Sequence, residues 1–408
     1  MFKSKRLESK SYLNVNFASL TIIYLVYSSI FVFLNNYFSI LFFNILDINR
    51  FVLALMQFLA YSILLLRPTF AAITDKYRIK GYQRKYYIIF SGYFLALIYL
   101  FLGLNYNNIL IFGVLLILIY ISSTMLDVST KSLVIDTSPT NEIKKKNLFF
   151  MFVGEALGKF FPFFLFFLLI NDIYSMSSWE TLILCSFLLL IPLLTILPFI
   201  TENNQEKLKV VENFDKFNSS NNKDSEFSPS FKTTFTLLCI FVFFAFSDVI
   251  FIYPFFPFIL TKFGLECFNL FNFFLIFYFL ISITSSAIGS FLIKRTKPKK
   301  ILFIFIPVIG IIYMFYTILP FIFFTTFYFI GCSLGTITNL NISVYIMKFK
   351  KENKSTYFHL IASFRHLSTF IFIPLGTLLS SFIATESLII IGAFLLNFSL
   401  LPLIFIKM

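Results

Sequence analysis

Long apolar stretches alternate with short polar segments along the whole 408-residue sequence. A helix that crosses a bilayer needs about 20 mostly apolar residues, and stretches of this kind recur about twelve times. Strands are excluded, because an open sheet edge is not tolerated in lipid. The predicted spans are 17–45, 50–68, 86–104, 109–135, 147–170, 180–200, 233–260, 268–293, 300–319, 321–347, 357–383 and 387–406. The pattern therefore predicts an all-α membrane protein with twelve transmembrane helices.

One polar segment is longer than the others and lies at the middle of the sequence. Residues 201–231 hold few apolar side chains and many Asn, Ser and charged residues, a composition typical of a flexible linker. This linker separates two six-helix halves, 17–200 and 232–408, and a short tail, 1–16, precedes the first half. The arrangement is similar to the layout of the major facilitator superfamily, in which two halves rock about a central site.

The distribution of Lys and Arg predicts the orientation. The net charge is +14, and most basic residues fall in the tail, in the central linker and in every second loop. Arg50 and Lys262 are left on the opposite side. Because cytoplasmic loops carry the excess of Lys and Arg, we expect both termini to be cytoplasmic. Topology thus accounts for the charge without a nucleic-acid partner.

Composition agrees with a protein whose surroundings are the lipid bilayer. The sequence is 59% hydrophobic and only 13% charged, far below the charged fraction of a soluble domain. The plasma membrane is taken as the default location, since no retention or transit signal stands out, and we expect a monomer.

The connection between the second and third predicted helices groups several charges around a turn. It runs from Arg67 and Pro68 through Asp75 to Gly81 and Arg84. We expect Asp75 to end a helix beside a tight turn at Gly81, where its carboxylate can pair with Arg or cap the next helix. We interpret these residues as a cytoplasmic gate motif. The alternative is an ordinary basic loop in which Asp75 is incidental.

The order of these residues resembles the folate–biopterin transporter family, a branch of the major facilitator superfamily. That family's loop runs Lys-Pro-x-x-Gly-x-x-x-Asp and then Pro-x-x-Gly-Tyr-x-Arg-Arg. The positions in register are Arg67-Pro68, Asp75, Gly81-Tyr82 and Arg84-Lys85, and the departures are Arg67, Ala71 and Arg78. The remainder of the resemblance outside this loop and one further patch is helix layout only.

The further patch is residues 127–136 in the fourth predicted helix, which resembles that family's Asp-Val-x-x-Asp-x-Leu-Val-x-Glu. Asp127 and Asp136 match the first and last acids, whereas Lys131 replaces the middle one. The resemblance implies a folate or pteridine as the transported solute and coupling to protons. The charge reversal at Lys131 leaves the usual substrate and the coupling ion open.

Ionisable side chains inside the predicted spans are the candidate site residues. Each costs about 2.5–3.5 kcal/mol to insert, so each needs a partner or a function. Asp127 and Lys131, and Glu155 and Lys159, are acid–base pairs at i, i+4, which places both members on one helical face. Each pair either neutralises itself for insertion or faces a watery cavity. Lys159 lies about 12 residues into its helix, hence roughly 18 Å deep.

The second half contributes fewer candidates. Asp248 lies in the seventh predicted helix, and Arg365 lies about 14 Å deep in the eleventh, where its fork suits a carboxylate or phosphate. Arg365 could instead pair with a buried acid and lock the halves together. Asn339 in the tenth helix could hydrogen-bond a ligand, although contact between helices is the commoner role.

Metal and haem chemistry are not indicated. The four cysteines have no metal spacing, and His359 and His366 share a helical face without a second pair. We expect no cofactor and no metal site. His366 remains a weaker candidate for a proton relay.

The sequence therefore predicts a secondary active transporter of an organic anion. The substrate-binding candidates are Lys131, Lys159, Arg365 and Asn339, and the coupling or gating acids are Asp127, Glu155 and Asp248. The alternatives are a facilitator of another small metabolite and a membrane-embedded enzyme. An enzyme would need a clustered acid, base or metal site, and a primary pump would need a phosphate-cradling loop. The sequence has neither pattern, and it gives no catalytic residue.

Overall fold

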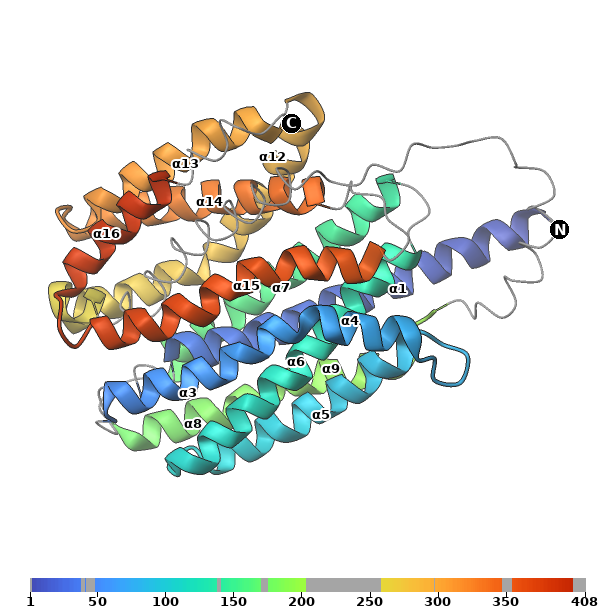
Figure 1. The fold of residues 1–408 in the computed structure, drawn as a ribbon, viewed down its shortest axis with the longest axis horizontal. Helices are drawn as coiled ribbons and strands as arrows, with labels where there is room; N and C mark the ends of the chain where they lie inside the picture. The colour runs from blue at the N-terminus through green and yellow to red at the C-terminus, as the bar shows by residue number, and fades with distance from the viewer. Residues whose placement is uncertain are drawn as a thin grey trace.

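The protein is described by a computed structural model that covers residues 2–37, 41, 48–137, 141–169, 175–202, 258–296, 298–346 and 354–398. Figure 1 shows a bundle of elongated helices that run roughly side by side. Among the described residues, seven helices are long and apolar enough to cross a membrane, and five shorter apolar helices accompany them. Where the described residues are not helical, they form loops and one isolated bridge, between Ile79 and Tyr82. The all-α prediction is confirmed.

The first half, coloured blue to green in Figure 1, contains six predicted spans, and each has a described helix. Several spans are divided into helical pieces by short 3-10 or π segments. The elements are α1 Phe2–Val32, η1 Phe33–Tyr37, α3 Arg50–Ser62, η2 Ile63–Leu66, α4 Arg67–Lys76, α5 Lys85–Leu104, α6 Ile109–Thr137, α7 Asn141–Leu169, α8 Met176–Ser186, η3 Phe187–Leu189, α9 Leu190–Ile196 and η4 Leu197–Phe199.

The second half is coloured yellow to red. Its described helices are Phe258–Ile276, α12 Tyr278–Arg295, α13 Pro298–Phe315, α14 Phe321–Ile346, α15 Lys354–Leu379 and α16 Thr385–Phe398. Gly264 has a φ of 82°, a left-handed conformation that breaks regular helical backbone. The seventh predicted span, apart from its last residues, and all but the first two residues of the predicted linker 201–231 lie outside the described residues.

Several helix boundaries differ from the sequence prediction. Residues 261–267, predicted to connect the seventh and eighth spans, lie within the helix Phe258–Ile276. α1 begins at Phe2 rather than near residue 17, so the predicted tail continues the helix. The second span does not end at residue 68, because the helical path continues through η2 and α4 to Lys76. Pro68 does not interrupt this path: it lies in the first turn of α4, where a missing N–H removes no helical hydrogen bond. Residues 69–76, predicted to lie in the connecting loop, are therefore helical.

Helices α1 and α7 pack closely along one glycine face of α7. A Cβ atom added at Gly154 would overlap the backbone oxygen of Thr21, and one added at Gly158 would overlap that of Leu25. The Ser29 hydroxyl donates to the carbonyl of Gly158 at 2.7 Å. Small residues allow such close backbone approach inside membranes. The packing fixes the rotation of α7 and so determines where the neighbouring Glu155 and Lys159 point.

The two halves meet along α15, which lies beside α3 and α4 in Figure 1. Near one end, Thr377 of α15 donates a hydrogen bond to the Gln57 side chain of α3 at 2.8 Å. Further along, the rings of Phe58 and Phe370 are 4.3 Å apart between centroids. One helix of the second half is thus in contact with the whole length of the second span, and we call this contact the α15 seam.

Candidate functional site

Asp127 of α6 is the centre of a buried group of polar side chains. It forms an ion pair with Arg67 of α4 and a second with Lys131, whose Nζ is 2.9 Å from Oδ1. The Tyr24 hydroxyl of α1 donates to the same carboxylate at 2.6 Å. The side chains of Arg67 and Asp127 are 2% and 1% exposed. We call Tyr24, Arg67, Asp127 and Lys131 the Asp127 cluster; it joins three helices of the first half.

The Asp127 cluster also reaches the second half of the molecule. Arg67 Nη1 is in hydrogen-bonding contact with Nε2 of His366 on α15. Seven residues earlier on the same helix, buried His359 contacts the hydroxyl of Ser132 on α6 at 3.3 Å. The two histidines therefore tie α15 to α4 and α6, and they extend the α15 seam to its far end.

Glu155 and Lys159 of α7 form a second ion pair, with Nζ and Oε1 2.9 Å apart. Their side chains are 40% and 28% exposed, although both lie well inside the apolar helix Phe149–Leu169. Lys159 Nζ is 5.6 Å from the ring centroid of Tyr278 on α12, close enough for a cation–π contact. This pair therefore lies where the two halves meet, and its polar groups are accessible.

The second half surrounds Lys159 with further polar side chains. Cys332 of α14 lies within electrostatic range of Lys159, and its thiol contacts the hydroxyl of Tyr328 one turn away. On the following turn, Gly335 has no heavy atom within 4 Å of the place where a Cβ would lie. Helix α14 thus borders open space at Gly335.

The two acid–base pairs have the geometry expected from their spacing. Asp127 is bonded to Lys131 and Glu155 to Lys159, each with an N to O distance of 2.9 Å. The i, i+4 pairing of both acids with their lysines is thus observed, and the sequence did not indicate Tyr24 as a partner of Asp127.

The predicted gate residues divide between two places. Arg84, 1% exposed, pairs with Asp75 of α4 and with Asp136 of α6, the latter through Nε at 3.1 Å. It also contacts the hydroxyl of Thr74. We call Thr74, Asp75, Arg84 and Asp136 the Arg84 cluster. Arg67, placed in the same motif by sequence, belongs instead to the Asp127 cluster, one helix length away along α4.

A tight turn presents Arg84 to its partners. Lys80 and Gly81 have φ values of 52° and 78°, and Ile79 and Tyr82 exchange backbone hydrogen bonds of 2.9 and 3.0 Å. Two successive positive φ values define a type I′ turn, which suits Gly. The chain therefore reverses sharply at Gly81 and returns Arg84 to the carboxylate of Asp75.

Glu202 is a further member of this region that the sequence did not indicate. Its carboxylate accepts hydrogen bonds from the backbone nitrogens of Gln83, Arg84 and Lys85 at 3.1, 2.9 and 2.7 Å. These N–H groups lie at the start of α5 and have no acceptor within the helix itself. Negative charge at this end is also favoured by the helix dipole. The only available signal was an acid directly after the sixth apolar stretch.

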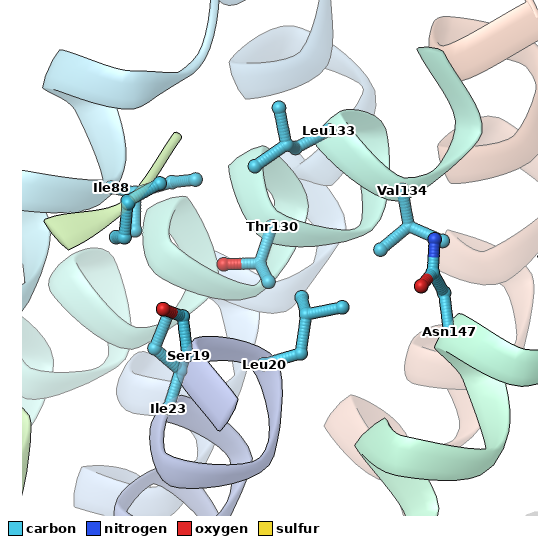
Figure 2. Close-up of a pocket in the computed structure, with 9 residues that line it drawn as sticks. Ser19, Leu20, Ile23, Ile88, Thr130, Leu133, Val134 and Asn147 are labelled. Atoms are coloured by element: carbon cyan, nitrogen blue, oxygen red, sulfur yellow. The ribbon is translucent and has the colours of Figure 1, made fainter. Parts of the chain in front are cut away.

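A small cavity lies inside the first half and is distinct from both ion-pair groups. Figure 2 shows its lining side chains, which come from α1, α5, α6 and α7 and from Ile200 after η4. Ser19, Thr130 and Asn147 are its polar members, and its volume is about 20 Å³. That volume holds one water molecule and is far too small for an organic solute. The cavity therefore does not compete with the interface between the halves as a solute site.

Three predicted site residues cannot be assigned a contact. Asp248 lies outside the described residues, and for Arg365 and Asn339 the structure describes only the helices that carry them, α15 and α14. Within the described part of the chain, no group of three His, Cys, Asp or Glu side chains is arranged to hold a metal ion.

These features define a helical membrane protein whose two halves meet along a seam. The sequence profile of the Major Facilitator Superfamily matches residues 160–373, and the chain belongs to this superfamily. The predicted fold, two six-helix halves of a major facilitator, is thereby confirmed.

The structure is also similar to a crystal structure of a D-xylose–proton symporter. The TM-score is 0.71 with 12% sequence identity, and the similarity covers 97% of this chain and 98% of the symporter. At this identity the likeness concerns the fold. A search among curated proteins finds no match to the sequence.

Proposed function

We propose that the protein is a secondary active transporter that moves an organic anion by alternating access, with folate or a pteridine as the leading candidate. The observation that carries the proposal is Lys159, a cation deep in a membrane helix whose side chain is 28% exposed at the interface between the halves. A charge at that depth is retained at a cost, and an accessible one attracts anionic solutes.

The folate or pteridine assignment rests on the two sequence patches that resemble the folate–biopterin transporters. Two of the matched acids, Asp75 and Asp136, share one arginine in the Arg84 cluster. This common role supports treating the patches as parts of one motif. We propose that the Arg84 cluster, with Gly81 as its turn and Pro68 at the start of α4, acts as the cytoplasmic gate, with both chain termini on that side and residues 201–231 as the linker.

Proton coupling is the second part of the proposal. The structurally similar symporter couples D-xylose to protons, and Asp127, Glu155 and Asp248 are the acids available here. Of the two described acids, Glu155 is the accessible one, at 40% exposure against 1% for Asp127. We therefore assign proton exchange to Glu155 in preference to Asp127.

A second candidate is a facilitator of another small metabolite. The observation in its favour is Lys131, which replaces an acid of the family pattern and is bonded to Asp127 at 2.9 Å. In that case the Asp127 cluster would not serve the solute of the folate–biopterin family. Either transporter is expected to act as a monomer in the bilayer.

The decisive experiment is uptake of labelled folate, biopterin and D-xylose into cells that express the chain. We expect folate or biopterin uptake to exceed that of control cells and to be lost in Lys159→Ala and reduced in Arg365→Ala. Lys300→Gln, an exposed substitution at the start of α13, is the matched control and should leave uptake unchanged. Uptake that survives both substitutions rejects the anion site, and uptake unaffected by a proton ionophore rejects proton coupling.

A further inference from the structure

The pair Glu155–Lys159 has a property that the other described ion pairs of the helices lack: both of its partners are accessible. The side chains are 40% and 28% exposed, whereas the Arg67–Asp127 pair is 2% and 1% exposed. Breaking an ion pair whose partners are exposed destabilises a protein less than breaking a buried one. The bond between Glu155 and Lys159 can therefore be exchanged at little cost to the fold.

The surroundings of Lys159 form one side of a site that includes both halves. Glu155 and Lys159 come from α7 of the first half, and the Tyr278 ring and the Cys332 thiol come from α12 and α14 of the second. The close packing of Gly154 and Gly158 against α1 prevents α7 from rotating these side chains away. Open space at Gly335 lies one turn beyond Cys332.

We propose that Glu155 is the resident counter-ion of a carboxylate site on Lys159, and that the carboxylate of a ligand binds by replacing it. This inference rests on the proposed function and adds the chemistry of the binding step. The present occupant of Lys159 is itself a carboxylate, held at 2.9 Å, so the site already fits that group. Lys159 is paired with one carboxylate before the exchange, that of Glu155, and with one carboxylate after it, that of the ligand. The Tyr278 ring of the other half contacts the Lys159 ammonium in both cases.

The effect of removing Glu155 distinguishes this competition from simple attraction of an anion to Lys159. Removing the resident carboxylate should strengthen ligand binding, although Glu155 belongs to the site. Removing the lysine should abolish binding. If Glu155 instead held Lys159 in a binding geometry, or contacted the ligand directly, its removal would weaken binding.

The natural Cys332 provides a reporter that needs no transport. Cys185, Cys239 and Cys267 are replaced by Ser, and the rate at which Cys332 reacts with a neutral methanethiosulfonate is measured in purified protein. Benzoate and folate serve as carboxylate probes, with benzamide as the uncharged match to benzoate. We expect both carboxylates to protect Cys332 and benzamide to have no effect.

The variants then test the exchange. Glu155→Gln should lower the half-protecting benzoate concentration by about fivefold or more, the factor expected when one nearby charge is removed in water. Lys159→Gln should abolish protection, and Lys300→Gln should change nothing. Unchanged or weaker protection in Glu155→Gln overturns the proposal, as does a Cys332 that reacts with no reagent.

A second readout covers the case in which the single-cysteine protein does not fold. With the natural cysteines retained, benzoate should raise the unfolding temperature of Glu155→Gln more than that of the unmodified protein, and a smaller or equal rise overturns the proposal. Neither readout depends on uptake. Protection by benzoate without folate uptake rejects the folate assignment alone, whereas Lys159-dependent uptake without carboxylate competition rejects the exchange alone.

Discussion

Two acid–base pairs of the same spacing have opposite environments in this protein. Asp127–Lys131 and Glu155–Lys159 are both i, i+4 pairs with an N to O distance of 2.9 Å. Asp127 also binds Arg67 and Tyr24 and is 1% exposed, whereas Glu155 has a 40% exposed side chain. The two pairs thus differ in burial: the carboxylate of the first is enclosed between helices, whereas both side chains of the second stay exposed.

The comparison predicts that replacing the two acids lowers the free energy of unfolding by different amounts. Removing one member of a buried ion pair leaves an uncompensated charge and costs about 3–5 kcal/mol. Breaking an exposed pair costs about 1 kcal/mol or less. The Asp127 cluster is therefore expected to hold the helices together, and the Glu155–Lys159 pair is expected to serve a ligand.

The largest expected effect is that of Asp127→Asn, which leaves buried Arg67 without its carboxylate. We expect a loss of about 3–5 kcal/mol of stability, measured as a lower unfolding midpoint in detergent. Glu155→Gln is the matched control, with a loss of about 1 kcal/mol or less. Arg67→Met combined with Asp127→Asn should recover part of the loss. Equal effects of the two single substitutions would remove the distinction between the pairs.

The second effect concerns the packing of α7 on α1, which places the Glu155–Lys159 pair. Gly158→Ala puts a Cβ against the backbone oxygen of Leu25, and overpacking of this kind costs about 1–3 kcal/mol. Gly335→Ala adds the same methyl group where no atom lies within 4 Å and should be neutral or slightly stabilising. Thermal unfolding of the two variants measures the difference. A neutral Gly158→Ala would mean that α1 and α7 can separate without cost.

A third carboxylate extends the comparison to the turn before α5. Glu202→Ala removes the acceptor of three backbone N–H groups, and the loss of a helix cap costs about 1 kcal/mol. We expect faster trypsin cleavage at Arg78 and Lys80 in purified protein, because the turn is less firmly held. Glu266→Ala, a substitution at an exposed residue, is the control. Unchanged cleavage would show that Glu202 does not secure the turn.

The smallest expected effect is that of replacing Lys131, the exposed member of the Asp127 cluster. Lys131 is 29% exposed, so Lys131→Gln should cost about 1 kcal/mol or less, since Asp127 keeps Arg67 and Tyr24. The unfolding midpoint should therefore stay close to that of the unmodified protein. A loss as large as that of Asp127→Asn would show that Lys131 is as essential to the cluster as Arg67.

The helices and the local pairs could be predicted from the sequence, because both depend on near neighbours. Apolar stretches determine the spans, and spacing of four residues places an acid beside its lysine. The ends of the helices were harder to predict. Helix α4 continues to Lys76, although polar residues interrupt the apolar stretch after Pro68. Helical hydrogen bonding persists there because α4 packs on α6 and α15.

The long-range partners could not be predicted. Arg67 was assigned to the gate motif, and its contacts are Asp127, 60 positions later, and His366 on α15. Nothing local to Arg67 specifies those partners, since they follow from the packing of α4 between the halves. Tyr24 and Glu202 were missed for the same reason. The sequence did contain one indication that the helix continues past Arg67. Pro68 follows Arg67 directly, and proline is favoured in the first turn of a helix.

The α15 seam has one more consequence, which concerns what any motion between the halves must break. At one end the Arg50 guanidinium contacts the Ser380 carbonyl and Gln57 accepts from Thr377. At the other end the contacts are Arg67 with His366 and Ser132 with His359. The α15 seam is therefore joined by polar contacts at both of its ends, and the halves can separate only if the contacts at one end break. In the proposed alternating-access cycle, we expect the end of the seam with the weaker contacts to separate first.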